Sequence, residues 1–209
     1  MGMPVTFKVG SELFLASGNS ILKEIHSRKF KTFLDLKFHD IPTTVSKAAN
    51  LVADFGVSMF TLHLMGGKNM IQDTRSILSA HTVKPKILGV SVLTSFSEEG
   101  WKATLSCVGE MPRNIETAVS RLVENGVKWG VDGVVCSSLE LGMIRKKYPD
   151  LYTVVPGIRP KGFGAQDQSR VMTPCEAKDL GASAIVVGRP ITQHEEPKKI
   201  IELILKDLQ

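Results

Sequence analysis

Short apolar segments alternate with amphipathic segments along the whole chain. The apolar segments are rich in Val, Ile, Leu and Phe and are bounded by turn residues, which predicts β-strands. The predicted strands are 5–9, 32–37, 59–64, 87–93, 133–137, 152–157 and 184–188. Segments between and after them carry apolar residues at helical spacing, among them 19–30, 45–56 and 195–209. The pattern therefore predicts strands and helices in regular alternation.

This alternation indicates a parallel sheet, because strands that alternate with helices form βαβ units. Several strands are almost continuously apolar, as expected where both faces of a parallel sheet are covered. No linker or low-complexity tract divides the chain, so we expect one domain over residues 1–209. Two architectures fit, a closed βα barrel and an open doubly wound sheet.

The positions of the polar residues favour the barrel. Such residues recur at or just after the carboxyl ends of strands, which converge on one mouth in a βα barrel. They are Lys8, Lys37, Asp40, His63, Thr94, Arg159 and Arg189. A closed barrel needs eight strands, whereas this pattern predicts seven, the first of them beginning near Met1. We expect an α/β fold of the TIM-type (βα)8 barrel class that lacks the first βα unit.

Composition narrows the class of ligand. The formal net charge of +5 suits an anionic small molecule. The Lys and Arg residues are scattered and only 6% of residues are aromatic, so no nucleic-acid surface is predicted. The sequence shows neither a long apolar run nor a signal-peptide pattern, and its three cysteines form no disulfide framework. We expect a cytoplasmic protein that binds no membrane.

The segment FLDLKFHDIPTTV, residues 33–45, contains the strongest candidate chemistry. Asp35 and Lys37 are two residues apart on a strand and so point to the same face, and Asp40 follows in the loop. An ammonium fixed beside a carboxylate can donate a proton and neutralise a developing carbanion. The alternative is an ion pair that only stabilises the barrel. Lys8 on the preceding strand argues against this alternative, because several neighbouring buried charges are costly.

Two histidines lie near these charges. His63 ends its strand and is expected to be a hydrogen-bonded wall residue, whereas His39 is expected on the opposite face from Lys37. No cluster of His, Cys and Asp has metal-ligand spacing, and no P-loop or GxGxxG motif occurs. We therefore predict no metal and no organic cofactor.

Two later segments are suited to an anion. Three glycines make segment 157–164 able to close over a ligand, with Arg159 and Gln168 as hydrogen-bond donors. Gly188 and Arg189 end the last strand, where barrels often bind phosphate through backbone amides and an Arg side chain. An ordinary surface loop and an Arg that covers the barrel rim are the alternatives.

Together these motifs resemble the orotidine 5′-phosphate decarboxylase family. FLDLKFHDIPTTV matches the family signature D-x-K-x-x-D-I-P-N-T, with Thr43 where Asn is usual. Further blocks match in order: FKVGSELF, GVSVLTS, DGVVCSSLE, VVPGIRP, DQSRVMTP and IVVGRPIT. The resemblance extends from about residue 5 to residue 209. It implies decarboxylation of orotidine 5′-phosphate (OMP) to UMP and CO2 in pyrimidine biosynthesis.

The resemblance also implies roles for individual residues. Lys37 would donate the proton to C6 of the pyrimidine, with Asp35 near the substrate carboxylate and Lys8 linking Asp35 to the ribose hydroxyls. Asp40 would complete the site of a neighbouring subunit, which implies a homodimer with shared active sites. The implied substrate contacts are Thr44, Thr94, Arg159, Gln168, Gly188 and Arg189.

One family feature does not occur in the sequence. Members begin with a strand that carries a ribose-binding Asp, followed by a helix, and neither precedes the strand 5–9. We expect either an upstream start or a truncated form, with open edges at the first and last strands. Two other functions remain as alternatives. One is a related Mg²⁺-dependent barrel, such as a hexulose-phosphate synthase, and the other is a non-catalytic barrel that binds a phosphate ligand.

Overall fold

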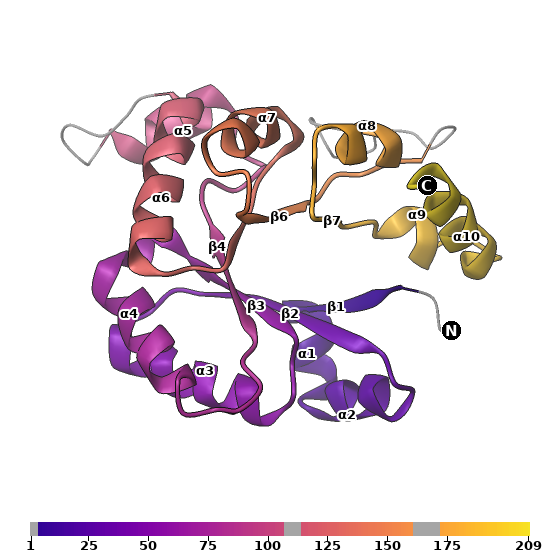
Figure 1. Cartoon of the computed structure of the whole chain (residues 1–209), viewed down its shortest axis with the longest axis horizontal. Helices are drawn as coiled ribbons and strands as arrows, with labels where there is room; N and C mark the ends of the chain where they lie inside the picture. Colours follow the sequence, from indigo (N-terminus) through magenta and orange to yellow (C-terminus); the bar gives the residue numbers. More distant parts are fainter. Residues whose placement is uncertain (1–3, 107–113, 161–171) are drawn as a thin grey trace. The chain divides into compact units, whose positions relative to one another are not determined.

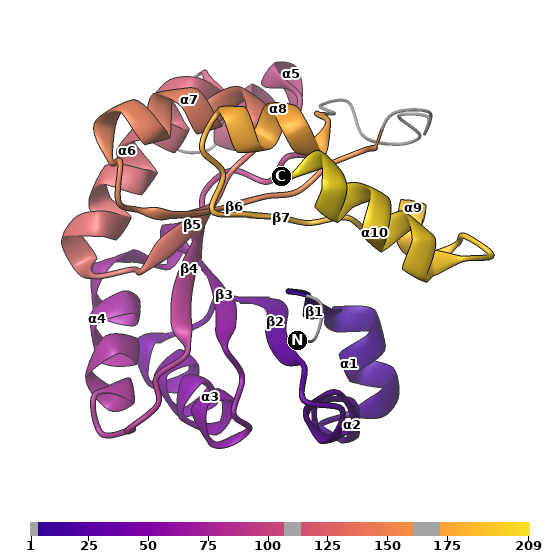
Figure 2. The same ribbon diagram turned by 45° about the vertical axis from the view of Figure 1, so that its right-hand side comes forward.

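The computed structural model describes residues 4–106, 114–160 and 172–209. Within them, seven strands follow one another in chain order through the sheet (Figures 1 and 2). The strands are β1 (Thr6–Gly10), β2 (Lys31–Phe38), β3 (Met59–His63), β4 (Lys86–Val90), β5 (Gly133–Val135), β6 (Tyr152–Val155) and β7 (Ala184–Ile185). Strands β1 and β2, β2 and β3, β3 and β4, and β6 and β7 pair in parallel. The expected parallel strands are confirmed, each close to its predicted range.

Helices lie between the strands and after β7. They are α1 (Ser11–Ser17), α2 (Ser20–Ser27), α3 (Pro42–Asp54), α4 (Gly67–Leu78), α5 (Glu98–Leu105), α6 (Ile115–Trp129), α7 (Ser138–Lys147), α8 (Pro174–Asp179), α9 (Arg189–Thr192) and α10 (Pro197–Asp207), with the short 3₁₀ helix η1 (Leu64–Gly66). No helix within the described ranges is long and apolar enough to span a membrane.

The chain divides into two compact units. Unit 1 comprises Met1–Val90 and Leu122–Gly133, and unit 2 comprises Ser91–Arg121 and Val134–Gln209, so the division passes through α6. The single domain expected from the sequence therefore stays a prediction.

Unit 1 holds strands β1–β4, with α3 and α4 packed against each other and against the sheet (Figure 2). Helix α3 begins with Pro42, whose fixed φ suits the first helical turn. Its residues Val45, Ala49 and Val52 are buried at helical spacing. The strands contribute the fully buried side chains Leu34, Phe60, Leu62, Ile87 and Leu88.

A tight packing arrangement fixes the end of β3. Leu64 follows that strand and is fully buried. A Cβ atom at Gly89 would lie 2.4 Å from a Leu64 methyl carbon, and one at Gly126 would lie 2.7 Å from it. The two glycines thus leave the space that Leu64 fills, which holds the neighbouring His63 at a defined position.

Strands β1 and β7 stand at the two ends of the strand order. Within the described residues β1 pairs with β2, and β7 pairs with β6. Phe7 on β1 is 43% exposed and meets Phe30 edge-to-face, with ring centroids 5.0 Å apart. The open strand edges expected from the sequence stay a prediction.

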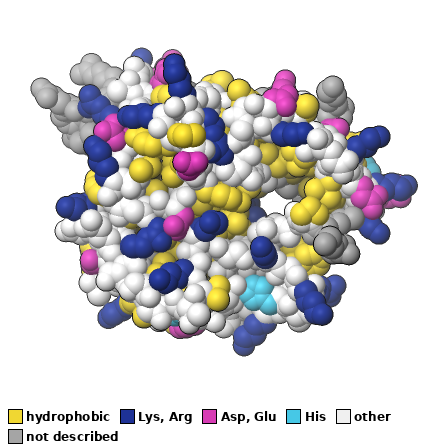
Figure 3. Space-filling view, in the orientation of Figure 1, with side chains coloured by type: hydrophobic (Ala, Val, Ile, Leu, Met, Phe, Trp, Pro, Cys, Tyr) yellow, Lys and Arg dark blue, Asp and Glu magenta, His cyan; other side chains and the backbone are white. Residues whose placement is uncertain are grey.

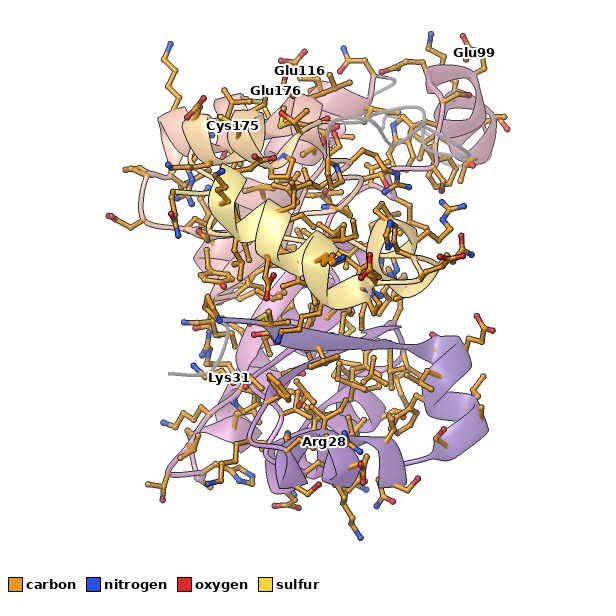
Figure 4. The ribbon with its side chains drawn as sticks, turned by 90° about the vertical axis from the view of Figure 1, so that its right-hand side faces the viewer. Arg28, Lys31, Glu99, Glu116, Cys175 and Glu176 are labelled. Carbon is orange, nitrogen blue, oxygen red and sulfur yellow. The ribbon has the colours of Figure 1, made fainter. Side chains whose placement is uncertain are left out.

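In unit 2, capping boxes define the starts of two helices. Ser137 and Glu140 hydrogen-bond reciprocally at the start of α7, and Thr173 and Glu176 do so at the start of α8. Glu176 and its neighbour Cys175 lie on the first turn of α8 (Figure 4). Each box satisfies amide groups that would otherwise lack partners at a helix N-terminus.

Arg145 ties the strands of unit 2 together at their amino ends. Its guanidinium donates to the carbonyls of Gly181 (2.5 Å), Pro149 (2.6 Å) and Leu151 (3.0 Å). It also donates to the hydroxyls of Thr153 (2.9 Å) and Ser183 (2.5 Å). One side chain therefore connects α7, β6 and the turn that leads into β7.

Replacing Arg145 by Ala should lower the free energy of unfolding by about 2–3 kcal/mol, because several charge-assisted hydrogen bonds are lost together. Chemical denaturation monitored by circular dichroism measures this change. Lys146→Ala, at an exposed position of the same helix, is the control and should change stability by less than about 0.5 kcal/mol. Equal stabilities of the two variants would contradict the role given to Arg145.

Candidate active site

The carboxylate of Asp35 is the centre of the charged cluster in unit 1. Its Oδ2 atom accepts from Lys8 Nζ at 3.2 Å, and its Oδ1 atom accepts from Lys37 Nζ at 2.9 Å. Thr61 Oγ1 donates to the same Oδ1 atom at 3.0 Å. The Asp35 side chain is 12% exposed, whereas that of Lys37 is 38% exposed. The Asp35 side chain is therefore largely covered, while the Lys37 side chain is partly exposed.

The backbone of β2 is irregular at this point. Leu34 pairs with Phe60 and Phe38 with Leu62, so four residue steps on β2 match two on β3. Lys37 lies in this irregular stretch and has a φ of 52°, in the left-handed region. Such a conformation costs a non-glycine residue about 1–3 kcal/mol and concentrates at functional sites. The register shift redirects the Lys37 side chain, as bulges beside active sites do.

The expected contact between Asp35 and Lys37 is present, but regular strand alternation does not produce it. The prediction rested on a regular strand, in which residues two apart share a face. In the structure the shifted register and the left-handed Lys37 backbone bring the two side chains together.

Opposing effects act on the ionisation of Asp35. Burial is the largest effect and by itself would raise the pKa of the carboxyl group. The hydrogen bond and charge of Lys37, the charge of Lys8 and the hydrogen bond from Thr61 together outweigh burial, so the pKa lies below its ordinary value of 3.8. Asp35 is therefore an anion at neutral pH.

The two histidines contact each other. The ring centroids of His39 and His63, the last residue of β3, lie 5.3 Å apart, so His39 packs against the end of β3. Burial lowers the pKa of His63 below 6.5, and the charges of His39 and Lys37 lower it further, against the opposing charge of Asp35. The His63 ring is therefore mainly neutral at pH 7, as a polar wall residue rather than a cation.

Asp40 and Thr44 are exposed at the start of α3. Asp40 Oδ1 accepts from the amide of Ile41 at 2.6 Å, and the amide of Thr44 donates to the carbonyl of Ile41 at 3.1 Å. Both interactions are local within this chain. The role of Asp40 in a neighbouring subunit's site and the contact of Thr44 with substrate stay predictions.

The other predicted substrate contacts belong to unit 2. Thr94 is half-buried after β4, and Gly188 precedes α9, which begins with the half-buried Arg189. Gln168 and residues 161–164 of the expected closing loop, 157–164, lie outside the described residues.

Arg159 is buried, with 7% of its surface exposed. Its amide donates to the carbonyl of Met172 and one guanidinium nitrogen donates to the carbonyl of Ile158. Its Nε atom is buried without a hydrogen-bond partner in the described structure. A buried donor in this state is suited to an acceptor atom of a ligand.

Thr61 is the contributor to the cluster that sequence reasoning missed. It is fully buried on β3, and it bonds both Asp35 and the backbone amide of Lys37. Its place two residues before His63, on the strand beside β2, is the signal that could have identified it.

No group of three or more His, Cys, Asp or Glu residues in the described ranges is arranged to hold a metal ion.

Figure 3 shows Lys and Arg side chains spread over one face, with acidic side chains between them. This spread matches the scattered basic residues of the sequence.

Parallel strands alternating with helices, with a charged cluster formed by β1, β2 and β3 around Lys37 near the carboxyl end of β2, are typical of an enzyme of the TIM-type class. The sequence matches the orotidine 5′-phosphate decarboxylase / HUMPS family over residues 3–204. The chain belongs to this family.

Several similar proteins are named orotidine 5′-phosphate decarboxylase. The orotidine 5′-phosphate decarboxylase of Alcanivorax borkumensis is 41% identical over 207 residues, covering 98% of this chain and 87% of the relative. That of Staphylococcus epidermidis is 45% identical over 195 residues, covering 93% of this chain and 83% of the relative. The crystal structure of orotidine 5′-phosphate decarboxylase from Lactobacillus acidophilus matches with a TM-score of 0.84 and 37% identity, covering 100% of this chain and 90% of that chain.

These matches confirm three predictions made from the sequence: the family resemblance, the TIM-type fold class, and an enzyme of a decarboxylase family. The site residues, the homodimer and the cytoplasmic location stay predictions.

Replacing Asp35 by Asn should lower the free energy of unfolding at pH 7 by about 1–3 kcal/mol, because Lys8 and Lys37 then lose their common counter-charge. Since the folded-state pKa of Asp35 is lowered, its ionised form stabilises the fold above about pH 4, and this contribution is lost as the pH falls through the folded-state pKa. The variant should accordingly lose less stability than the wild type on acidification.

Urea denaturation at a series of pH values between 3 and 7 measures both effects. Asp150→Asn, which changes an exposed carboxylate, is the matched control. A wild-type pH dependence retained in Asp35→Asn would contradict the account of Asp35.

Proposed function

We propose that the chain decarboxylates OMP to UMP and CO2, with Lys37 as the proton donor to C6 of the pyrimidine. The observation that carries this proposal is the Lys37 ammonium, which Asp35 holds by a hydrogen bond on a partly exposed side chain near the carboxyl end of β2. Membership of the decarboxylase family supports the choice of reaction.

The chemistry requires a proton source and an opposite charge near C6. When the C6–carboxylate bond breaks, CO2 leaves and the electron pair remains on C6 as a carbanion with no adjacent electron sink. The ammonium of Lys37 stabilises that pair by its charge and then transfers a proton to it, which forms the C6–H bond of UMP. Neutral Lys37 regains its proton from solvent before the next turnover.

Asp35 has two roles in this proposal. It orients the Lys37 ammonium through the 2.9 Å hydrogen bond, and it lies near the carboxylate of bound OMP. Two anions at close range favour departure of the substrate carboxylate as neutral CO2, because the repulsion between them is relieved in the transition state. Lys8, held at 3.2 Å from Asp35, connects this centre to the ribose hydroxyls.

The remaining contacts hold the distal parts of OMP. We assign the pyrimidine to Thr94, and the phosphate to Gln168, Gly188 and Arg189. Arg159 supports the substrate through its buried guanidinium, and Thr44 contributes a hydroxyl from the start of α3. Binding energy from the phosphate is then available at the reacting carbon. No metal or organic cofactor takes part in this proposal.

Purified chain should convert OMP to UMP with a change in ultraviolet absorbance, and Lys37→Ala should lower kcat by at least about 100-fold, because proton donation is lost. Lys47→Ala, at an exposed position of α3, is the matched control and should keep wild-type kcat.

Two additions to this assay separate the alternatives. Turnover of OMP should continue in EDTA, whereas a requirement for Mg²⁺ would indicate the related sugar-phosphate barrels. Binding of UMP by calorimetry without any turnover of OMP would contradict the proposal and indicate a non-catalytic binder.

We also propose a homodimer in which Asp40 completes the partner's site. Lys37→Ala and Asp40→Ala chains, each inactive alone, should regain about a quarter of wild-type activity when co-expressed. Random pairing makes half of the two-fold dimers mixed, and each mixed dimer has one intact site.

Co-expression of Lys37→Ala with Asp35→Ala is the control for the mixing experiment. Both residues come from the same chain, so every site stays defective and no activity should return. Failure of the Lys37→Ala and Asp40→Ala pair to regain activity would contradict shared sites.

A further inference from the structure

The hydroxyl of Thr61 joins two separate parts of Lys37. The backbone amide of Lys37 donates to Thr61 Oγ1 at 2.9 Å, and Thr61 Oγ1 donates to Asp35 Oδ1 at 3.0 Å. The same Oδ1 atom accepts from Lys37 Nζ at 2.9 Å. The amide, the hydroxyl, the carboxylate and the ammonium thus form a closed ring of hydrogen bonds that begins and ends on one residue.

The direction of each hydrogen bond in this ring is fixed by chemistry. An amide N–H can only donate, so the Thr61 oxygen must accept from Lys37. The hydroxyl proton must then point elsewhere, and an ionised Asp35 carboxylate can only accept. In a single orientation the Thr61 hydroxyl therefore accepts from the Lys37 amide and donates to the Asp35 carboxylate.

The position of Thr61 makes it a rigid support. Its side chain is fully buried and β-branched, which restricts χ1. Thr61 also pairs in register with Leu88 of β4, so the strand on its far side holds its backbone. The hydroxyl therefore occupies a fixed point from which the left-handed Lys37 backbone receives its hydrogen bond.

We propose that Thr61 is a positioning residue for the decarboxylation, one that fixes the direction in which Lys37 presents its ammonium. The inference rests on the proposed function, in which Lys37 donates a proton to C6. Thr61 acts through Lys37 and Asp35 and touches no reacting atom. Without its hydroxyl the Lys37 amide loses its acceptor, the register shift loses a support, and the ammonium samples more directions.

The comparison of Thr61→Val with Thr61→Ser tests this role. Val keeps the shape and removes the hydroxyl, whereas Ser keeps the hydroxyl and removes the methyl group. Thr61→Val should lower kcat for OMP about 10- to 100-fold, the range for a lost hydrogen bond in a charged network, with KM and the Kd of UMP changed less than about 3-fold. Thr61→Ser should retain kcat within about 3-fold of wild type.

A second readout does not depend on turnover. Loss of the Thr61 donor should raise the pKa of Asp35 in Thr61→Val but not in Thr61→Ser. A pH titration followed by ¹³C NMR of the Asp35 carboxyl carbon measures this pKa. If the wild type does not decarboxylate OMP, the proposed function fails, and the Asp35 titration still decides whether the hydroxyl supports the cluster.

Three results would overturn the inference. These are a wild-type kcat in Thr61→Val, an equal loss in Thr61→Val and Thr61→Ser, and an unchanged Asp35 titration in Thr61→Val. If Thr61→Val does not fold, Thr61→Ala against Thr61→Ser repeats the comparison, because these two side chains differ only in the hydroxyl.

Discussion

The hydrogen-bonded carboxylate of Asp35 is the interaction on which the site depends. Lys8 and Lys37 are like charges held within 3.2 Å and 2.9 Å of it, so each would repel the other without the anion between them. The carboxylate, in turn, is costly to bury unless donors surround it. Three strands supply those donors, Lys8 from β1, Lys37 from β2 and Thr61 from β3. Parallel order places their carboxyl ends together, and the fold thereby assembles a charged cluster from residues far apart in sequence.

The surrounding structure maintains the strain at this cluster. Lys37 has a left-handed backbone within a shifted register, a conformation that persists only where neighbours enforce it. The Thr61 hydroxyl is one such neighbour, and the buried Leu64 fixes the end of the same strand. A static ammonium has functional value, because an electrostatic centre that is organised before reaction needs no reorganisation as charge develops on the substrate. The stability of unit 2 has a separate source in the hydrogen bonds of Arg145.

Apolar periodicity was sufficient to predict the seven strands, because buried parallel strands are nearly continuous hydrophobic runs. Spacing also predicted the contact of Asp35 with Lys37, although through a regular pleat that the register shift replaces. Backbone shifts of this kind depend on the neighbouring strand and leave no local mark in the sequence. The sequence did not predict the role of Thr61 for a similar reason. Thr is a common strand residue, and only the folded structure shows that its hydroxyl donates to Asp35. The role proposed for Asp40 would involve a second chain, and the contacts of Asp40 within this chain, such as its bond to the Ile41 amide, do not reveal such a role.

The central claim is that Lys37 exchanges a proton with C6 of the pyrimidine. The most direct measurement follows the C6 hydrogen of UMP in D2O by ¹H NMR, in the presence of the purified chain. The account predicts exchange of deuterium into C6 with the wild type, since product and carbanion interconvert through the same ammonium, and loss of that exchange in Lys37→Ala. Exchange that continues at the wild-type rate in Lys37→Ala would show that another group carries the proton and would contradict the account.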